Sequence, residues 1–303
     1  MEWPVSHIVD SLASSVIRGI EKSIVSKNSK MHLSDKPAEI SKLNMEMFLI
    51  LKFNDLVLVE NLTGLDLRDR LQPVRNFLYE RLDRLPGLRD LQLGEASHGY
   101  TPDIFRTQFL AGLSNMRRLV KFSLHFDCFD KLLSILAENC KGTLKVIDIE
   151  QSLHVTDGSI ESFHECKKLL DLNIFSCGFT CEGQARLLTG LPGLLNLRRG
   201  DFLCDALEWV DWLDGDQPPR LNITEFFSSE TYHFHTVHQM LTVANICPNI
   251  RKMRFIFSKE HFISYSNLSC FKNIQELHLC GGDFYDGITA LLVPQLSLHV
   301  PRR

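Results

Sequence analysis

The stretch between Cys140 and Leu197 repeats one arrangement of leucine and isoleucine three times. It reads Leu144-Lys-Val-Ile147-Asp-Ile149, then Leu169-Leu-Asp-Leu172-Asn-Ile174, then Leu194-Leu-Asn-Leu197. Each step from Ile147 to Leu172 and from Leu172 to Leu197 is 25 residues. A fixed period in the twenties with the pattern L-x-x-L-x-L is typical of leucine-rich repeats, in which every repeat supplies one strand and one helix or helical turn.

The same pattern extends to both sides, with steps of 24 to 31 residues. The second leucine position of each repeat falls at Leu65, Leu91, Phe122, Ile147, Leu172, Leu197, Thr224, Met253 and Leu277. Thr224 is a poor match, so the seventh repeat is predicted to be degenerate, and Leu296-Ser-Leu298 is predicted to begin a tenth strand. We therefore expect an α/β leucine-rich-repeat solenoid, a horseshoe with parallel strands on the concave face, helices on the convex face and a short N-terminal helical element.

The second half of a repeat is predicted to be helical. After Ile149 come Val155-Thr156-Asp157 and then Ile160, Phe163 and Cys166, which recur every three residues and form one apolar stripe. Thr156 or Asp157 is expected to cap the helix by accepting from a free backbone N–H.

These residues resemble the cysteine-containing leucine-rich repeat of F-box proteins, which is of the ribonuclease-inhibitor-like type. Val155-Thr156-Asp157 matches its [IV]-T-D element, Cys166-Lys-Lys-Leu169 its closing C-x-x-L, and Cys177 its turn cysteine. The resemblance covers about Leu62 to Leu298, but a clear F-box is missing. It implies the repeat architecture and suggests a role as the substrate-recognition subunit of a cullin-RING ubiquitin ligase.

Composition narrows the environment of the chain. At 303 residues and a net charge of −4, the sequence has no strong basic character, so we expect neither nucleic acid nor a membrane as partner. Its nine cysteines are odd in number, and several occupy core positions of the repeats. Free thiols of this kind indicate a reducing compartment, and we expect the cytoplasm, with the nucleus as the alternative.

The domain prediction places an N-terminal helical cap or adaptor-binding element at residues 1–58 and an array of about nine repeats at residues 59–303. Apolar residues spaced by three or four predict helices over Pro4–Val25 and Ala38–Leu51. The first helix is similar to the elongin-binding box, S-L-x-x-x-C-x-x-x-[AILV], through Leu12 and Ile20, although Val16 replaces the cysteine. This similarity implies adaptor binding by Leu12, Val16 and Ile20. The alternative is a helix that only covers the core of the first repeat.

Residues for catalysis are not evident in the sequence. Serine-nucleophile elbows and phosphate-binding glycine loops are absent. His235 and His238 are spaced as a helical pair, but zinc requires three or four ligands and no partner stands at a suitable spacing. We therefore predict no enzyme activity, no metal and no cofactor.

Binding is expected on the concave face, because strand alternation directs the residues between the leucines to that side. One predicted column lists Asp66, Gln92, Ser123, Asp148, Asn173, Arg198, Glu225, Arg254 and His278. A second column contains Asp171 and Lys252, and a third contains Glu150, Phe175, Phe227 and Ile256.

Two features of these columns suggest a site for a protein partner. Asp148, Glu150 and Asp171 are predicted to form an acidic patch. Phe175, Phe227 and Ile256 are predicted to be exposed apolar residues along one edge, and the predicted contact set is completed by Asn173, Arg198, Lys252 and Arg254. Such residues suit the centre of an interface, but ordinary solvated charges and phenylalanines folded under a loop would give the same sequence.

Three functions are compatible with this surface. The leading hypothesis is a non-enzymatic protein-binding scaffold that serves a cullin-RING ligase. The second is a general interaction module in signalling or immunity without a ligase. The third is a GTPase-activating repeat scaffold, for which Arg198 and Asn173 are the candidate residues.

Overall fold

The computed structural model describes residues 62–68, 79, 81–95, 103–200, 203–213, 219–228, 237–256, 270–280 and 297–299. The predicted N-terminal helices and the adaptor-binding residues Leu12, Val16 and Ile20 lie outside these residues. The chain divides into two compact units, Met1–Asp127 with Glu138–Leu144, and Cys128–Ala137 with Lys145–Arg303. Each unit is built from parallel strands and helices, as expected for an α/β leucine-rich-repeat solenoid.

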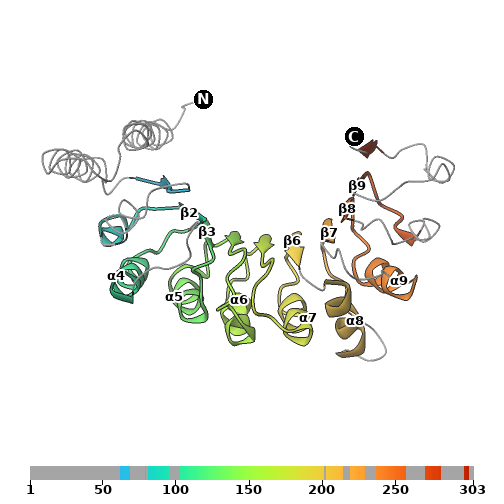
Figure 1. The fold of residues 1–303 in the computed structure, drawn as a ribbon, viewed down its shortest axis with the longest axis horizontal. Helices are drawn as coiled ribbons and strands as arrows, with labels where there is room; N and C mark the ends of the chain where they lie inside the picture. Colours follow the sequence, from blue (N-terminus) through green and yellow to red (C-terminus); the bar gives the residue numbers. More distant parts are fainter. Residues whose placement is uncertain are drawn as a thin grey trace, which may run out of the picture. The chain divides into compact units, whose positions relative to one another are not determined.

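The described residues of the first unit include three parallel strands in chain order (Figure 1). They are β1 (Gly64–Asp66), β2 (Asp90–Glu95) and β3 (Lys121–His125), with the 3-10 helix η1 (Leu82–Arg84) and the helix α4 (Asp103–Ser114) between them. Leu65 pairs with Leu91, and Leu91 pairs with Phe122. These three are the predicted second leucine positions, so the register predicted for the first three repeats is confirmed.

The second unit continues the alternation of strand and helix. Its strands are β4 (Val146–Asp148), β5 (Asp171–Asn173), β6 (Asn196–Gly200), β7 (Glu225–Ser228), β8 (Lys252–Ile256), β9 (Glu276–Cys280) and β10 (Ser297–His299). Its helices are η2 (Asp157–Ser159), α6 (Ile160–Glu165), α7 (Cys181–Thr189), α8 (Leu203–Leu213) and α9 (Val237–Ile246), while α5 (Asp130–Cys140) contributes residues to both units. The strands are parallel, and β10 pairs with β9 through Leu298 and Leu277, which confirms the predicted tenth strand.

The register of the seventh repeat was predicted wrongly. Phe226, not Thr224, pairs with Leu197 on one side and with Met253 on the other. Phe226 is 1% exposed and fills the core, whereas the Thr224 hydroxyl donates to the backbone carbonyl of Leu195 at 3.3 Å. A large apolar side chain gains about 1.5–3 kcal/mol from full burial, and a threonine in its place would bury its hydroxyl. Phe226 therefore occupies the core position of this repeat, and Glu225 and Phe227 belong to other columns than predicted.

The predicted helical stripe is confirmed in α6 and the turn that follows it. Ile160, Phe163 and Cys166 are all buried. Cys166 shows the role of the cysteines, because its thiol is buried and donates to the backbone carbonyl of Ser162 at 3.5 Å. All seven cysteines whose side chains are described are free, and burial raises the pKa of Cys247 to about 12. The buried thiols among them, those of Cys128, Cys140, Cys166 and Cys247, act as small apolar groups of the core.

A pair of threonine caps ties successive repeats of the second unit together. The Thr156 hydroxyl accepts from a backbone N–H in its own helical turn, as predicted, and its own N–H and O–H donate to the Asp130 carboxylate at 2.8 and 2.6 Å. One repeat later, Thr180 caps α7 and donates in the same way to Asp157 at 3.0 and 2.6 Å. The Thr156-Asp157 pair therefore caps its own helix and accepts from the next repeat.

Candidate interaction surface on the strand face

Helices cover one side of the strands in the second unit, as α6 to α9 show in Figure 1. We call the other side of β4 to β9 the strand face. The register of these strands defines two rows of residues across it. The first row is Val146, Asp171, Asn196, Glu225, Lys252 and Glu276. The second row has two parts, separated by a shift in the pairing of β6 with β7: Asp148, Asn173 and Arg198, then Phe227, Arg254 and His278.

The rows correct the predicted columns at β7. Glu225 pairs with Asn196 and Lys252, so it belongs to the first row and not beside Arg198. Phe227 pairs with Arg254 and belongs to the second row. The pairing of β6 with β7 shifts between Leu197 and Gly200, where β6 has one residue more than β7. A bulge of this type accommodates an extra residue without breaking the sheet.

The middle of the strand face carries a closed polar network, which we call the central network. Asn173 is 5% exposed, and its Nδ2 donates to Asp148 Oδ1 and to Glu150 Oε2, both at 3.0 Å. Its Oδ1 accepts from the backbone N–H of Phe175 at 3.2 Å. Next to it, Arg198 Nη2 lies 2.6 Å from Asp171 Oδ2.

The three carboxylates of the predicted acidic patch are engaged within the central network. The structure does bring Asp148 and Glu150 together, but through the amide of Asn173. Asp171 is 9% exposed and ion-paired with Arg198. A buried carboxylate is tolerated only when it is paired in this way. These residues hold neighbouring repeats together, and their part in partner binding stays a prediction.

The strand face differs over β7 to β9. Lys252 Nζ lies 3.7 Å from Glu225 Oε1 and 3.4 Å from Glu276 Oε2, so one ammonium group bridges two carboxylates. Arg254, two residues further along β8, is half-buried, and its Nε is buried with no hydrogen-bond partner. The sequence did not indicate this buried Nε, because a paired and an unpaired arginine in a strand have the same sequence pattern.

The predicted apolar edge is only partly formed. Phe175 and Phe227 are half-buried, not fully exposed, and they occupy different positions along their repeats. Phe175 follows β5 two residues after Asn173, whereas Phe227 lies within β7 beside Arg254. Ile256 ends β8, and its side chain lies outside the described part of the structure. Phe227 and Arg254 are thus the adjoining aromatic and cationic residues of this surface.

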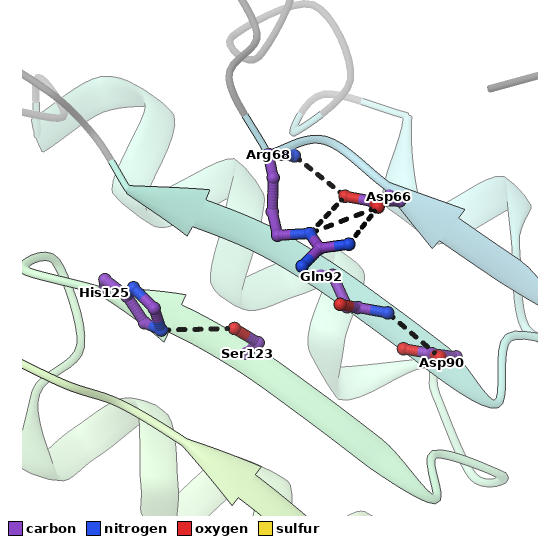
Figure 2. A network of polar contacts seen from close by, with 6 residues as sticks. All are labelled: Asp66, Arg68, Asp90, Gln92, Ser123 and His125. Carbon is purple, nitrogen blue, oxygen red and sulfur yellow. Dashed lines mark hydrogen bonds and ion pairs between the residues drawn. The ribbon is translucent and has the colours of Figure 1, made fainter. Parts of the chain in front are cut away.

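The strand residues of the first unit form a separate set of polar contacts (Figure 2). Asp66 accepts from Arg68 Nη2 at 2.7 Å, and Asp90 Oδ2 accepts from Gln92 Nε2 at 3.1 Å. Asp90 Oδ1 is buried and has no hydrogen-bond partner. Burial raises the pKa of Asp90 above its ordinary value, although Lys121 and Gln92 lower it. Alternation places Asp90 on this surface, but the sequence does not reveal its burial.

Metal and membrane features are absent from the described residues. No group of three or more His, Cys, Asp or Glu among them is arranged to hold a metal ion. Within the same part of the chain, no helix has the length and apolar character that a membrane span requires.

Similarity to known proteins is found among solved structures. No model of a known protein family and no curated protein matches the sequence. Among solved structures, the chain is similar to the Rad7 and Elc1 complex of yeast, with 13% identity over 82% of this chain and 70% of that chain and a TM-score of 0.49. It is also similar to the leucine-rich-repeat protein LegL7 from Legionella pneumophila, with 16% identity, 82% and 79% coverage and a TM-score of 0.42.

A third similar structure is an internalin from Listeria monocytogenes, with 11% identity, 88% and 82% coverage and a TM-score of 0.33. At these identities the similarity concerns the fold alone. The fold itself is defined by the strand register and the buried leucine positions, which are those of an α/β leucine-rich-repeat solenoid.

Proposed function

We propose that the chain is a non-enzymatic scaffold that binds a protein partner on the strand face of its second unit. The observation that carries this proposal is the adjoining pair of Phe227 and Arg254, an aromatic ring and a guanidinium on neighbouring strands. Aromatic residues and arginine are the residue types most enriched at the centres of protein interfaces. A repeat array also offers a long continuous surface on which a partner can bind.

The finer proposal is that this scaffold recognises substrates for a cullin-RING ubiquitin ligase. Two sequence features support it: the resemblance of the repeats to those of F-box proteins, and the similarity of the segment around Leu12, Val16 and Ile20 to an elongin-binding box. In this role the repeats hold a substrate while the N-terminal segment binds the adaptor. Proximity alone then accelerates a transfer that another subunit performs.

The GTPase-activating alternative is weakened at Asn173, which is 5% exposed and donates through Nδ2 to two carboxylates of the central network. Arg198 engages Asp171 through Nη2 alone, and its side chain is 50% exposed. A residue that stabilises a transition state must present free donors to the ligand, so Arg198 is the remaining candidate for this alternative. A general interaction module without a ligase differs from the main proposal only in the N-terminal partner.

A reducing compartment, the cytoplasm or the nucleus, is part of the proposal. The free cysteines support it, because buried thiols such as Cys247 serve the core as apolar groups.

The test is affinity capture from cells followed by mass spectrometry. Replacing Phe175 and Phe227 together by serine should reduce capture of the partner by roughly tenfold or more, because truncating an aromatic hot spot removes most of its contact. Leu241 provides the matched control, because it is an apolar residue 46% exposed on α9, on the helical side. Leu241→Ser should leave capture unchanged.

Deletion of Met1–Lys30 separates the ligase role from general binding. If the ligase proposal holds, cullin and adaptor subunits co-purify with the full chain and disappear on deletion, while the strand-face partner remains. Capture that survives the double serine replacement, with an unchanged thermal midpoint, would contradict binding on the strand face.

A further inference from the structure

Arg254 is the charged residue of the strand face whose surroundings do not satisfy it. It lies within β8, is half-buried, and has a buried Nε without an acceptor. A guanidinium in that state has lost part of its hydration and received no hydrogen bond in return, which is unfavourable. Such a residue is stabilised when a ligand supplies an acceptor.

The neighbouring carboxylates are already engaged by another cation. Glu225 and Glu276, which flank β8 in the first row, both lie within ion-pair distance of Lys252. The third carboxylate of the same row, Asp171, is paired with Arg198. Within the described part of the chain, no carboxylate lies within ion-pair distance of Arg254, so none of the described carboxylates competes with a ligand for it.

Phe227 places an aromatic ring on the adjacent strand. It pairs with Arg254 in the β7–β8 register, and neighbouring strands of a sheet are about 4.8 Å apart. The ring is half-buried, so part of its surface remains available to a partner. A cation and an apolar ring at this separation match a carboxylate and an apolar side chain close together in the sequence of a ligand.

We propose that Arg254 and Phe227 bind a segment of the protein partner in which one aspartate or glutamate stands beside an apolar residue. Arg254 receives the carboxylate through its N–H donors, and Phe227 packs against the apolar side chain. This inference rests on the proposed function, because it names the chemistry of the partner that the strand face binds.

The charge balance around Arg254 favours a single carboxylate over an acidic run. Lys252 and Arg254 together balance Glu225 and Glu276, so this part of the strand face has no excess positive charge. Recognition then depends on the directed hydrogen bonds of the guanidinium, which are strong when the acceptor is charged. A second acidic residue of the ligand would meet Glu225 or Glu276 and would be repelled.

The test begins with selection of short random peptides on the immobilised full chain. The selected peptides should contain one acidic residue beside a leucine, phenylalanine or tyrosine. A selected peptide is then synthesised with its acidic residue and with the matching amide, and both forms are titrated against the wild type and Arg254→Met. The Arg254→Met change should weaken the acidic peptide roughly ten- to a hundredfold.

The four affinities form a double-mutant cycle, which gives the interaction energy between Arg254 and the acidic residue of the peptide. The amide peptide should bind wild type and Arg254→Met equally, and Arg254→Lys should recover only part of the affinity because lysine lacks the planar fork. Equal binding of the acidic peptide to wild type and Arg254→Met would overturn the inference. Selection of peptides without an acidic residue would also overturn it.

Two further outcomes distinguish this inference from the proposed function. If no acidic peptide is selected but the cellular partner is still lost on replacing Phe175 and Phe227 by serine, the inference fails and the proposed function stands. If a short oligouridylate binds more tightly than the selected peptides and loses that affinity in Arg254→Met, the guanidinium takes a nucleic-acid phosphate and the inference is overturned.

Discussion

The central network over β4 to β6 and the segment of strand face over β7 and β8 lie on the same rows but treat their charges differently. Around Asn173, the carboxylates of Asp148 and Glu150 share one amide, and Asp171 is paired with Arg198. At Arg254, a buried Nε is left without a partner. A charge on a repeat surface is therefore not by itself a sign of binding, because a paired charge joins repeats and an unpaired charge is available to a ligand.

Asn173→Ala should have the largest effect, because it breaks the paired region. The change removes the donor shared by two carboxylates and leaves the Phe175 N–H without its acceptor. Unsatisfied buried groups cost about 1–3 kcal/mol, so the free energy of unfolding should fall by about 2–3 kcal/mol. Urea denaturation followed by circular dichroism measures the change.

Asn273→Ala is the control for this prediction. Its amide is exposed and donates once, to the backbone carbonyl of Pro248 at 2.9 Å. The same truncation should therefore cost about 0.5–1 kcal/mol. Equal losses for the two variants would mean that the central network contributes no more than a surface hydrogen bond.

Much of the fold could be predicted from the sequence, because every repeat gives independent evidence for the register of the strands. Ile147, Leu172 and Leu197 pair as their even spacing predicts. The prediction failed at Thr224, where two neighbouring positions compete for the core and the pattern alone does not weigh them. Burial decides between them, because Phe226 has far more apolar surface to remove from water than threonine has.

The surface was less predictable than the core. Alternation correctly placed Arg198 and Arg254 on the strand face. It did not indicate that Arg198 pairs with Asp171, or that Lys252 engages both neighbouring glutamates and leaves Arg254 unpaired. These outcomes depend on distances between side chains of different repeats, and a one-dimensional pattern fixes which residues are neighbours without fixing which of them bond.

Asp90→Asn should raise the free energy of unfolding, by less than Asn173→Ala lowers it. It extends the comparison to the first unit, where Asp90 Oδ1 is buried without a hydrogen-bond partner. Burial raises the pKa of Asp90, so ionising it destabilises the folded state. In the folded state the Asp90 carboxyl stays protonated at pH values above its ordinary pKa of 3.8. The stability that this protonation contributes is lost as the pH rises through the raised pKa. At pH 7 the variant should therefore be more stable than wild type, by less than about 1 kcal/mol.

The pH dependence identifies this cause. The advantage of Asp90→Asn in thermal midpoint should shrink as the pH falls from 7 toward 3.8, because wild-type Asp90 then becomes neutral as well. Asp66→Asn is the matched control, since the Asp66 carboxylate accepts from Arg68 at 2.7 Å and its loss should lower the midpoint. A pH-independent advantage for Asp90→Asn would contradict the account.

Arg254→Met should have the smallest effect on stability, although it abolishes the proposed binding. Methionine keeps an unbranched apolar stem and removes a buried Nε that has no acceptor, so the free energy of unfolding should stay within about 0.5 kcal/mol of wild type or rise slightly. Lys252→Met on the same strand is the control, because it breaks contacts with Glu225 and Glu276 and should be the less stable of the two. A loss for Arg254→Met as large as that for Asn173→Ala, in the same urea titration, would mean that Arg254 holds the repeats together, and the contrast between the two regions would disappear.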